Sequence, residues 1–153
     1  MTIVGMGPGN SHATAKKFGL EGYRIAMIGR NTMRHETYRK LLANDNIESF
    51  SIEGDAGNEN SLTMAFDRIQ ENIGATDVLL YNAFTYRDCP PTGLTYQHML
   101  EDFRTNVGGA LVSAQCVIPK MLEKNAGSIL FTGGGMAFEP IPKFSSLALG
   151  KAA

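Results

Sequence analysis

Three glycines near the start of the chain could bring backbone N–H groups up to a phosphate. Gly5, Gly7 and Gly9 follow a short apolar segment, residues 2–4, and precede a helix-forming stretch, residues 11–20. Glycines let a chain turn tightly and approach a ligand closely, and a helix N-terminus adds partial positive charge. Glycine-rich turns also occur where no ligand binds. The chemistry therefore depends on what the following elements place around this turn.

Five predicted strands alternate with helices along the chain. The strands are residues 2–4, 24–29, 47–52, 77–81 and 127–132, and the helices are residues 11–20, 32–43, 61–73 and 96–122. Strict alternation predicts right-handed β-α-β crossovers and a parallel sheet, and apolar strands without polar alternation agree with it. We expect a Rossmann-type doubly wound α/β fold in three α/β/α layers, with strand order 3-2-1-4-5. Its ligand crevice then lies at the carboxyl ends of the first and fourth strands.

Composition fits one globular domain over residues 1–153, with 43% hydrophobic residues to build its core. Fourteen basic residues against 15 acidic ones give a net charge of -1, which argues against partners such as nucleic acid or a membrane surface. No apolar run approaches the roughly 20 residues that span a bilayer.

Cys89 and Cys116 have no motif spacing and suit a reducing cytoplasm. The three histidines stand singly, so we predict no metal site.

Basic side chains follow the second predicted strand. Arg30 comes directly after it, Arg34 lies one helical turn later, and no Asp or Glu occurs from residue 22 through residue 35. In this fold an acid at that position receives the ribose 2′-hydroxyl of NAD, whereas an Arg accommodates the 2′-phosphate of NADP. The alternative is an Arg that only lies in solvent. The missing acid and the present guanidinium predict a preference for NADP(H) over NAD(H).

Small and polar residues after the strands form a recognisable series. Residues 4–11 lie under the pattern Thr-Gly-x-x-x-Gly-x-Gly, with Gly5 and Gly9 matching and Val4 and Ser11 departing from it. Residues 81–84 (Tyr-Asn-Ala-Phe) lie under Asn-Asn-Ala-Gly and keep its middle pair. Further matches are Asp55 after the third strand, Asn106 in the long fourth helix and Lys151 near the end. These matches occur in the same order and at the same spacing as in the short-chain dehydrogenase/reductase family, and the whole chain resembles that family.

The resemblance implies an NAD(P)(H)-dependent oxidoreductase that transfers hydride between nicotinamide and a small carbonyl or alcohol substrate. The implied cofactor-binding residues are Gly5, Gly7, Gly9, Asn10, Ser11, Arg30, Asp55, Ala56, Asn82, Ala83 and Lys151. Ser11 stands where the family has its third glycine. Its Cβ would crowd the packing of helix and strand, whereas its hydroxyl could donate to a phosphate, so the direction of its effect is open.

Two of the family's catalytic positions carry residues that cannot move a proton. Leu147 stands four residues before Lys151, where the family has the proton-transferring Tyr. Gly134 stands thirteen residues earlier, where the family has the Ser that polarises the substrate oxygen. Asn106 and Lys151 remain as catalytic candidates. General acid catalysis is typically worth about 10²–10⁴-fold, so the usual mechanism should be badly impaired.

Three explanations compete. In the first, another group transfers the proton, with Tyr81, Tyr86, Ser145 and Ser146 as candidates; Tyr86 comes first, because its loop borders the substrate pocket in the family. As the simpler alternative, Tyr86 only caps that pocket. Alternatively the chain is a catalytically silent NADP(H)-binding or oligomerisation module, or its substrate needs little acid catalysis.

The family continues past this point with the rest of the fifth long helix, a sixth strand and a substrate-covering segment. The sequence is therefore expected to be a C-terminally incomplete domain whose fifth strand is an exposed edge. By the same resemblance we expect a homodimer or homotetramer formed through the fourth and fifth helices. Another parallel α/β protein, such as a methyltransferase, fits the first turn but not Lys151 or the Asn82-Ala83 pair.

Overall fold

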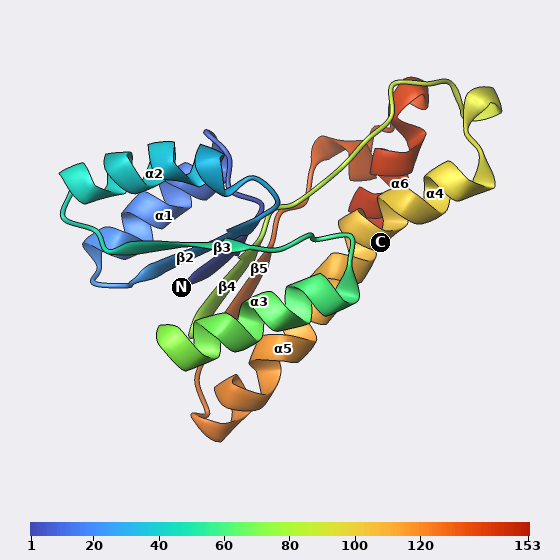
Figure 1. The fold of residues 1–153 in the computed structure, drawn as a ribbon. Coiled ribbons are helices and arrows are strands. Elements are labelled where there is room, and N and C mark those ends of the chain that lie inside the picture. Colours follow the sequence, from blue (N-terminus) through green and yellow to red (C-terminus); the bar gives the residue numbers. More distant parts are fainter.

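The computed structural model describes residues 1–153 and contains a five-stranded sheet in the order β3-β2-β1-β4-β5 (Figure 1). All four neighbouring pairs are parallel. The strands are β1 (Thr2–Val4), β2 (Ile25–Gly29), β3 (Ser49–Glu53), β4 (Val78–Tyr81) and β5 (Ser128–Phe131). The predicted doubly wound Rossmann-type fold and its strand order are confirmed.

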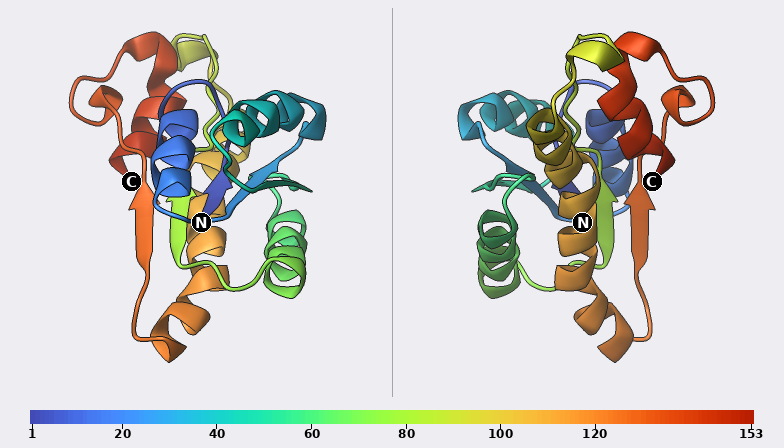
Figure 2. Two further views of the ribbon diagram at one scale, coloured as in Figure 1. Left: turned by 90° about the vertical axis from the view of Figure 1, so that its left-hand side faces the viewer. Right: turned by 90° about the vertical axis from the view of Figure 1, so that its right-hand side faces the viewer.

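Helices cover both faces of the sheet. They are α1 (Asn10–Leu20), α2 (Thr32–Asn44), α3 (Glu59–Asn72), α4 (Tyr96–Phe103), α5 (Gly109–Glu123) and α6 (Ser145–Ala152). Figure 1 shows α1 and α2 on one face and α3 and α5 on the other. Two further views place α6 beyond the carboxyl end of β5 (Figure 2). No helix is long and apolar enough to cross a membrane.

The predicted continuous helix over residues 96–122 is interrupted. A π-helical turn, Arg104–Gly108, joins α4 to α5. Such turns often mark functional sites, because the extra residue re-aims the side chains of the turn. Asn106 lies in this turn, so its orientation differs from the one that a regular helix would give it.

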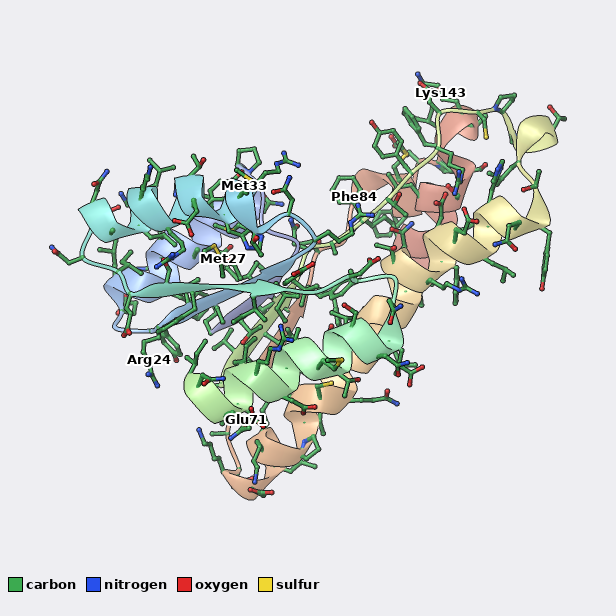
Figure 3. The ribbon with its side chains drawn as sticks, viewed as in Figure 1. Arg24, Met27, Met33, Glu71, Phe84 and Lys143 are labelled. Carbon is green, nitrogen blue, oxygen red and sulfur yellow. The ribbon has the colours of Figure 1, made fainter.

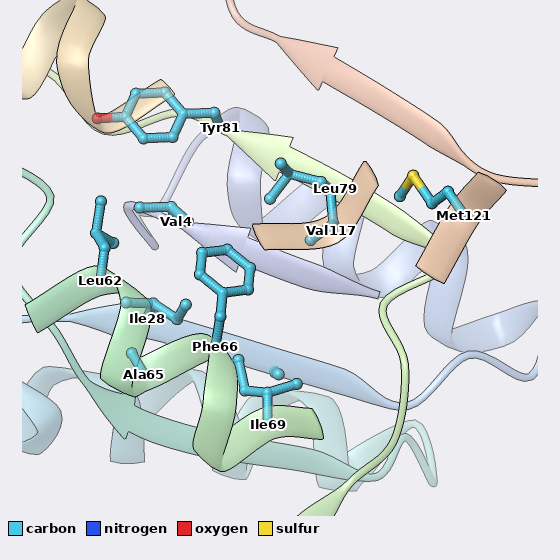
Figure 4. Packing of buried hydrophobic residues seen from close by; sticks show 11 residues of the cluster. Val4, Ile28, Leu62, Ala65, Phe66, Ile69, Leu79, Tyr81, Val117 and Met121 are labelled. Carbon is cyan, nitrogen blue, oxygen red and sulfur yellow. The ribbon is translucent and has the colours of Figure 1, made fainter. Parts of the chain in front are cut away.

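Alternate residues of β1, β2 and β4 build two cores. Val4, Ile28 and Leu79 face α3 and α5, where they meet Leu62 and Phe66 (Figure 4). Their neighbours Ile3, Met27 and Leu80 point the other way, into a second cluster with Ala15 of α1 and Leu42 of α2. This explains the apolar strands of the sequence, because a parallel sheet covered on both faces leaves no polar side.

Strand register brings the strand ends to one edge of the sheet. Val4 is paired with Ile28 on one side and with Tyr81 on the other. The residues that follow these strands, including Gly5 and Asn82, therefore emerge side by side. Strand β5 pairs only with β4, and Leu130 and Phe131 on it are exposed.

Candidate functional site

A cavity of about 590 Å³ opens at the carboxyl ends of β1 to β4. Its volume lies in the range of ligand pockets, and its place is the topological switch point where α/β sheets bind ligands. Seven of the sequence-predicted cofactor residues line it: Gly5, Gly7, Arg30, Asp55, Ala56, Asn82 and Ala83. The lining does not include Gly9, Asn10, Ser11, Tyr86, Asn106 or Lys151.

Gly5 joins the first turn to the loop after β4. Its φ angle is +88°, and its N–H donates to Ile28 O at 3.1 Å. A Cβ on Gly5 would lie 2.5 Å from Ala83 N. From the other side, Asn82 donates its backbone N–H to Val4 O at 2.9 Å and its Nδ2–H to Gly5 O at 3.3 Å. The two loops that face the cavity are therefore held as one unit.

Ser11 supports this turn from inside. Its side chain is fully buried, and its hydroxyl donates to Gly5 O at 2.8 Å. The hydroxyl therefore braces the glycine turn, and the suggestion that it donates to a phosphate is wrong for this geometry. Gly7 and Gly9 behave differently, because a Cβ on either would meet no atom within 4 Å. Their backbone faces open space just before α1 begins at Asn10.

The turn after β2 carries positive charge. Arg30, Arg34 and His35 all line the cavity, and Asn31 caps α2 by accepting the Arg34 N–H at 3.2 Å. No carboxylate comes from this segment. Asp55 enters from the end of β3, where its Oδ1 accepts the Gly57 N–H at 2.9 Å.

His35 is the buried member of this group. It is 3% exposed, and its Nδ1 lies 2.8 Å from Ser51 Oγ. Burial is the main cause that lowers the pKa of His35 from its ordinary value of 6.5, and the nearby Arg34 adds to this effect. The folded protein therefore holds this imidazole in its neutral form more strongly than the unfolded chain does.

Protonation of His35 at acidic pH should consequently lower the free energy of unfolding. As the pH falls below about 6.5, the unfolded chain binds a proton at this side chain before the folded one does, so the free energy of unfolding declines. One such group contributes a slope of at most about 1.4 kcal/mol per pH unit. Urea denaturation across this range should show a shallower decline for His35→Asn, which keeps a partner for Ser51. A decline unchanged from that of the native chain would contradict the assignment, and His12→Gln is the matched control.

The side-chain amide of Asn106 binds the loop after β4. Its Nδ2–H donates to Thr85 O at 2.9 Å, and its Oδ1 accepts the Thr85 N–H at 2.8 Å. A Cβ on Gly150 of α6 would lie 2.6 Å from Asn106 Cβ, so the two elements pack closely here. The side chain of Asn106 thus positions the loop of Thr85, and one Nδ2–H and one lone pair of Oδ1 remain for a further partner.

Lys151 lies between the end of β5 and this loop. Its Nζ donates to Thr132 O at 2.7 Å and lies 5.7 Å from the centroid of the Phe84 ring. Burial lowers the pKa of the Lys151 ammonium. A Cβ on Gly134 would lie 3.8 Å from Lys151 Cδ, so a side chain at position 134 would be in ordinary contact with the lysine.

Three of the four candidate proton donors are closed off. Tyr81 is buried, its hydroxyl donates to Thr105 O, and burial raises the pKa of this phenol above its ordinary range. The hydroxyls of Ser145 and Ser146 are buried without a hydrogen-bond partner. Tyr86 is 52% exposed and lies beside Phe84, so it alone is accessible.

A charged group in the cavity was missed at the sequence level. Arg87 Nε lies 3.4 Å from Asp102 Oδ1, Arg87 also pairs with Glu101, and all three residues line the cavity. Asp102 is only 2% exposed. The sequence shows two acids on a helix and an Arg in a loop, which is the pattern of an ordinary solvated surface. Only the packing of α4 against that loop makes the pair a part of the site.

Comparisons with known proteins agree with this geometry. The family model "short chain dehydrogenase" matches residues 1–153. A 3-oxoacyl-[acyl-carrier-protein] reductase of Bos taurus is 24% identical over 86% of this chain and 54% of its own length. A cis-toluene dihydrodiol dehydrogenase of Pseudomonas putida is 28% identical over 90% of this chain and 50% of its own. The chain thus spans about half the length of these curated relatives.

Solved structures share the fold. A metagenomic short-chain oxidoreductase in complex with NADP has a TM-score of 0.91 at 17% identity, over 98% of this chain and 68% of its own. A 3-oxoacyl (acyl-carrier-protein) reductase of Agrobacterium tumefaciens C58 with NADP bound has a TM-score of 0.88 at 20% identity, over 99% of this chain and 59% of its own. Given the full-length match of the family model, this chain belongs to the short-chain dehydrogenase family.

Proposed function

We propose that the chain is the NADP(H)-binding part of an oxidoreductase that transfers hydride between nicotinamide and a small carbonyl or alcohol substrate. The observation that carries this proposal is the cavity at the switch point, with Arg30 and Arg34 at the end of β2 and no carboxylate on that segment. The two structural neighbours described above hold NADP, which supports a cofactor of this class.

The residues present fit such a cofactor. The open backbone of Gly7 and Gly9, with Asn10 as the first residue of α1, suits a pyrophosphate, and the Arg30 fork suits a 2′-phosphate. Asp55 and Ala56 would face the adenine, Asn82 and Ala83 the adjoining ribose, and Lys151 the nicotinamide ribose. Bound there, the nicotinamide would supply the hydride exchange. Ser11 and Gly5 would act on binding only by shaping the turn.

The substrate oxygen could be protonated in two ways at this site. Tyr86 would transfer the proton, because its side chain is accessible and Lys151 lies on the neighbouring Phe84. Alternatively the substrate needs little acid catalysis. Asn106 would contribute in either case by holding the Thr85 loop.

A silent NADP(H)-binding or oligomerisation module is the second candidate function. Leu147 and Gly134 favour it, since neither can transfer a proton. Assembly as a homodimer or homotetramer is also proposed, through the predicted fourth helix, which is α4 and α5 in the structure, and the predicted fifth helix, which is α6. The exposed Leu111 and Leu122 of α5 are compatible with it. The free thiols of Cys89 and Cys116 suit the proposed cytoplasmic location.

Replacing Arg30 by Ala should weaken NADPH binding about 10- to 100-fold and leave NADH binding nearly unchanged. Hydrogen bonds to a charged group are worth about 1.5–3 kcal/mol, and each 1.4 kcal/mol is a tenfold change in affinity. Isothermal titration calorimetry of both nucleotides checks this. Arg39→Ala is the matched control, because Arg39 pairs with Glu36 on α2 and does not line the cavity. Equal losses for NADPH and NADH would contradict a 2′-phosphate contact.

A further inference from the structure

Three aromatic side chains form a cluster beside the cavity. We name Phe84, Tyr86 and Phe144 the ring cluster. Phe84 and Tyr86 are stacked, with ring centroids 6.4 Å apart and planes at 20°, and Tyr86 meets Phe144 edge-on at 5.3 Å. Phe84 and Tyr86 are each 52% exposed. Phe84 also lines the cavity, so the cluster adjoins it, and Figure 3 shows the side chain of Phe84.

Two ammonium groups adjoin the ring cluster, and only one of them is neutralised. Lys143 Nζ lies 4.7 Å from the Phe144 centroid and 3.3 Å from Asp88 Oδ2. Lys151 Nζ lies by Phe84 and bonds to Thr132 O, and it forms no ion pair with any carboxylate. The site therefore offers two exposed, nearly parallel rings, Phe84 and Tyr86, with an ammonium group without a carboxylate partner beside Phe84.

Few side chains near Lys151 could donate a proton to a substrate oxygen. Leu147 presents an aliphatic chain one helical turn before it, and Gly134 presents no side chain across from it. Tyr81, Ser145 and Ser146 are closed off as proton donors. A substrate whose anionic product needs a proton during hydride transfer would therefore depend on Tyr86 alone.

Substrates differ greatly in how much the anion formed by hydride transfer needs a proton. Hydride addition to a simple ketone produces an alkoxide, whose conjugate acid is about as weak as water, with a pKa of about 15.7. Hydride addition to a quinone produces a phenolate-type anion, because the ring becomes aromatic, and a phenol has a pKa of about 10. A quinone is also planar, which suits stacking on exposed rings.

We propose that the substrate class of this site is a quinone, stacked on the ring cluster with one oxygen beside the Lys151 ammonium. This inference rests on the proposed NADP(H)-dependent oxidoreductase function. The quinone accepts a hydride from a reduced nicotinamide: the C–H bond of the nicotinamide breaks and its electron pair forms an O–H bond. The ring electrons shift to leave the negative charge on the second oxygen, near Lys151. The hydroquinone monoanion then takes a proton from water, and the nicotinamide is left oxidised.

Binding is tested first, on the chain without cofactor. The probe is duroquinone (tetramethyl-1,4-benzoquinone), whose substituted ring carbons prevent addition of Cys89 or Cys116. Saturation-transfer NMR on its methyl line should show binding that weakens about 2- to 10-fold in Phe84→Leu and in Tyr86→Leu, since an aromatic pair is worth about 0.5–1.5 kcal/mol. Tyr86→Phe should restore it, and Tyr96→Leu, an exposed ring outside the cluster, should not change it. Equal binding to all variants would overturn the proposal.

Turnover is tested next, under anaerobic conditions with NADPH. The chain should oxidise NADPH with duroquinone at least 10-fold faster than with acetophenone, and Lys151→Met should lower kcat for the quinone. Acetophenone reduction at the same rate would overturn the quinone assignment. If NADPH binds but duroquinone is neither bound nor reduced, this inference fails while the proposed cofactor function stands. If NADPH does not bind, the proposed function fails, and the inference fails with it.

Discussion

A Leu147→Tyr, Gly134→Ser double variant should reduce acetophenone with NADPH about 10²–10⁴-fold faster than the native chain, which is the typical contribution of general acid catalysis. Residues 147 and 151 stand at i and i+4 in α6, so a phenol introduced at position 147 shares a helix face with the Lys151 ammonium. That positive charge favours the ionised phenol and makes it a better proton donor near neutral pH.

The structure has room for a side chain at position 134. Gly134 has an extended backbone with φ of −178°, which any residue adopts, and its added Cβ would be in ordinary contact with Lys151 Cδ at 3.8 Å. The gain is measured as the rate of NADPH loss with acetophenone as substrate. Leu149→Tyr is the matched control, because Leu149 is exposed on α6 but is not one turn from Lys151.

The outcome also separates the proposed functions. Activity that appears only in the double variant identifies the native chain as silent toward ketones. If the native chain already reduces acetophenone and Tyr86→Phe abolishes this activity, Tyr86 is the substitute donor. No gain in a double variant that still binds NADPH would contradict the placement of Leu147 and Gly134 around the reacting oxygen.

Replacing Gly5 by Ala should lower the free energy of unfolding by about 2–5 kcal/mol. The left-handed backbone at φ of +88° costs a non-glycine residue roughly 1–2 kcal/mol, and overpacking costs about 1–3 kcal/mol more. Overpacking is unavoidable because the new Cβ would lie 2.5 Å from Ala83 N, and a backbone atom cannot move aside as a flexible side chain does.

Urea denaturation of the purified variant measures this loss, and NADPH titration should show weaker binding with it, because the two cavity-facing loops separate. Gly7→Ala is the matched control in the same turn. Its Cβ would meet no atom within 4 Å, so its stability should remain close to that of the native chain. Equal losses for the two variants would show that the contact between Gly5 and Ala83 is not the cause.

Much of the fold follows from local chemistry that the sequence displays. Apolar strands of three to six residues, separated by helices with one apolar face, have few arrangements other than a covered parallel sheet. In the third helix, for example, Leu62, Phe66 and Ile69 predict the buried face that the structure shows. The placement of Gly5, Arg30 and Asn82 at one edge followed as well, because parallel strands end together.

Individual roles within the site were less predictable. The sequence allowed Tyr81, Ser145 and Ser146 as proton donors, whereas the structure buries all three hydroxyls or pairs them. Asn106 lies on a helix by its sequence pattern, but its amide binds Thr85, which is 21 residues away. Asp102 resembles a surface acid in sequence and is buried against Arg87 in the fold.

The sequence by itself therefore determined the family, the parallel sheet and the basic turn at Arg30, because these depend on residue type and on spacing along the chain. Only the tertiary structure decided that Ser11 braces the glycine turn, that Asn106 holds a loop, and that Lys151 adjoins an aromatic surface. The physical reason is that burial and hydrogen-bond partners depend on contacts between distant segments. One hydroxyl or amide has the same appearance in a sequence whether it faces solvent, a ligand or a backbone carbonyl.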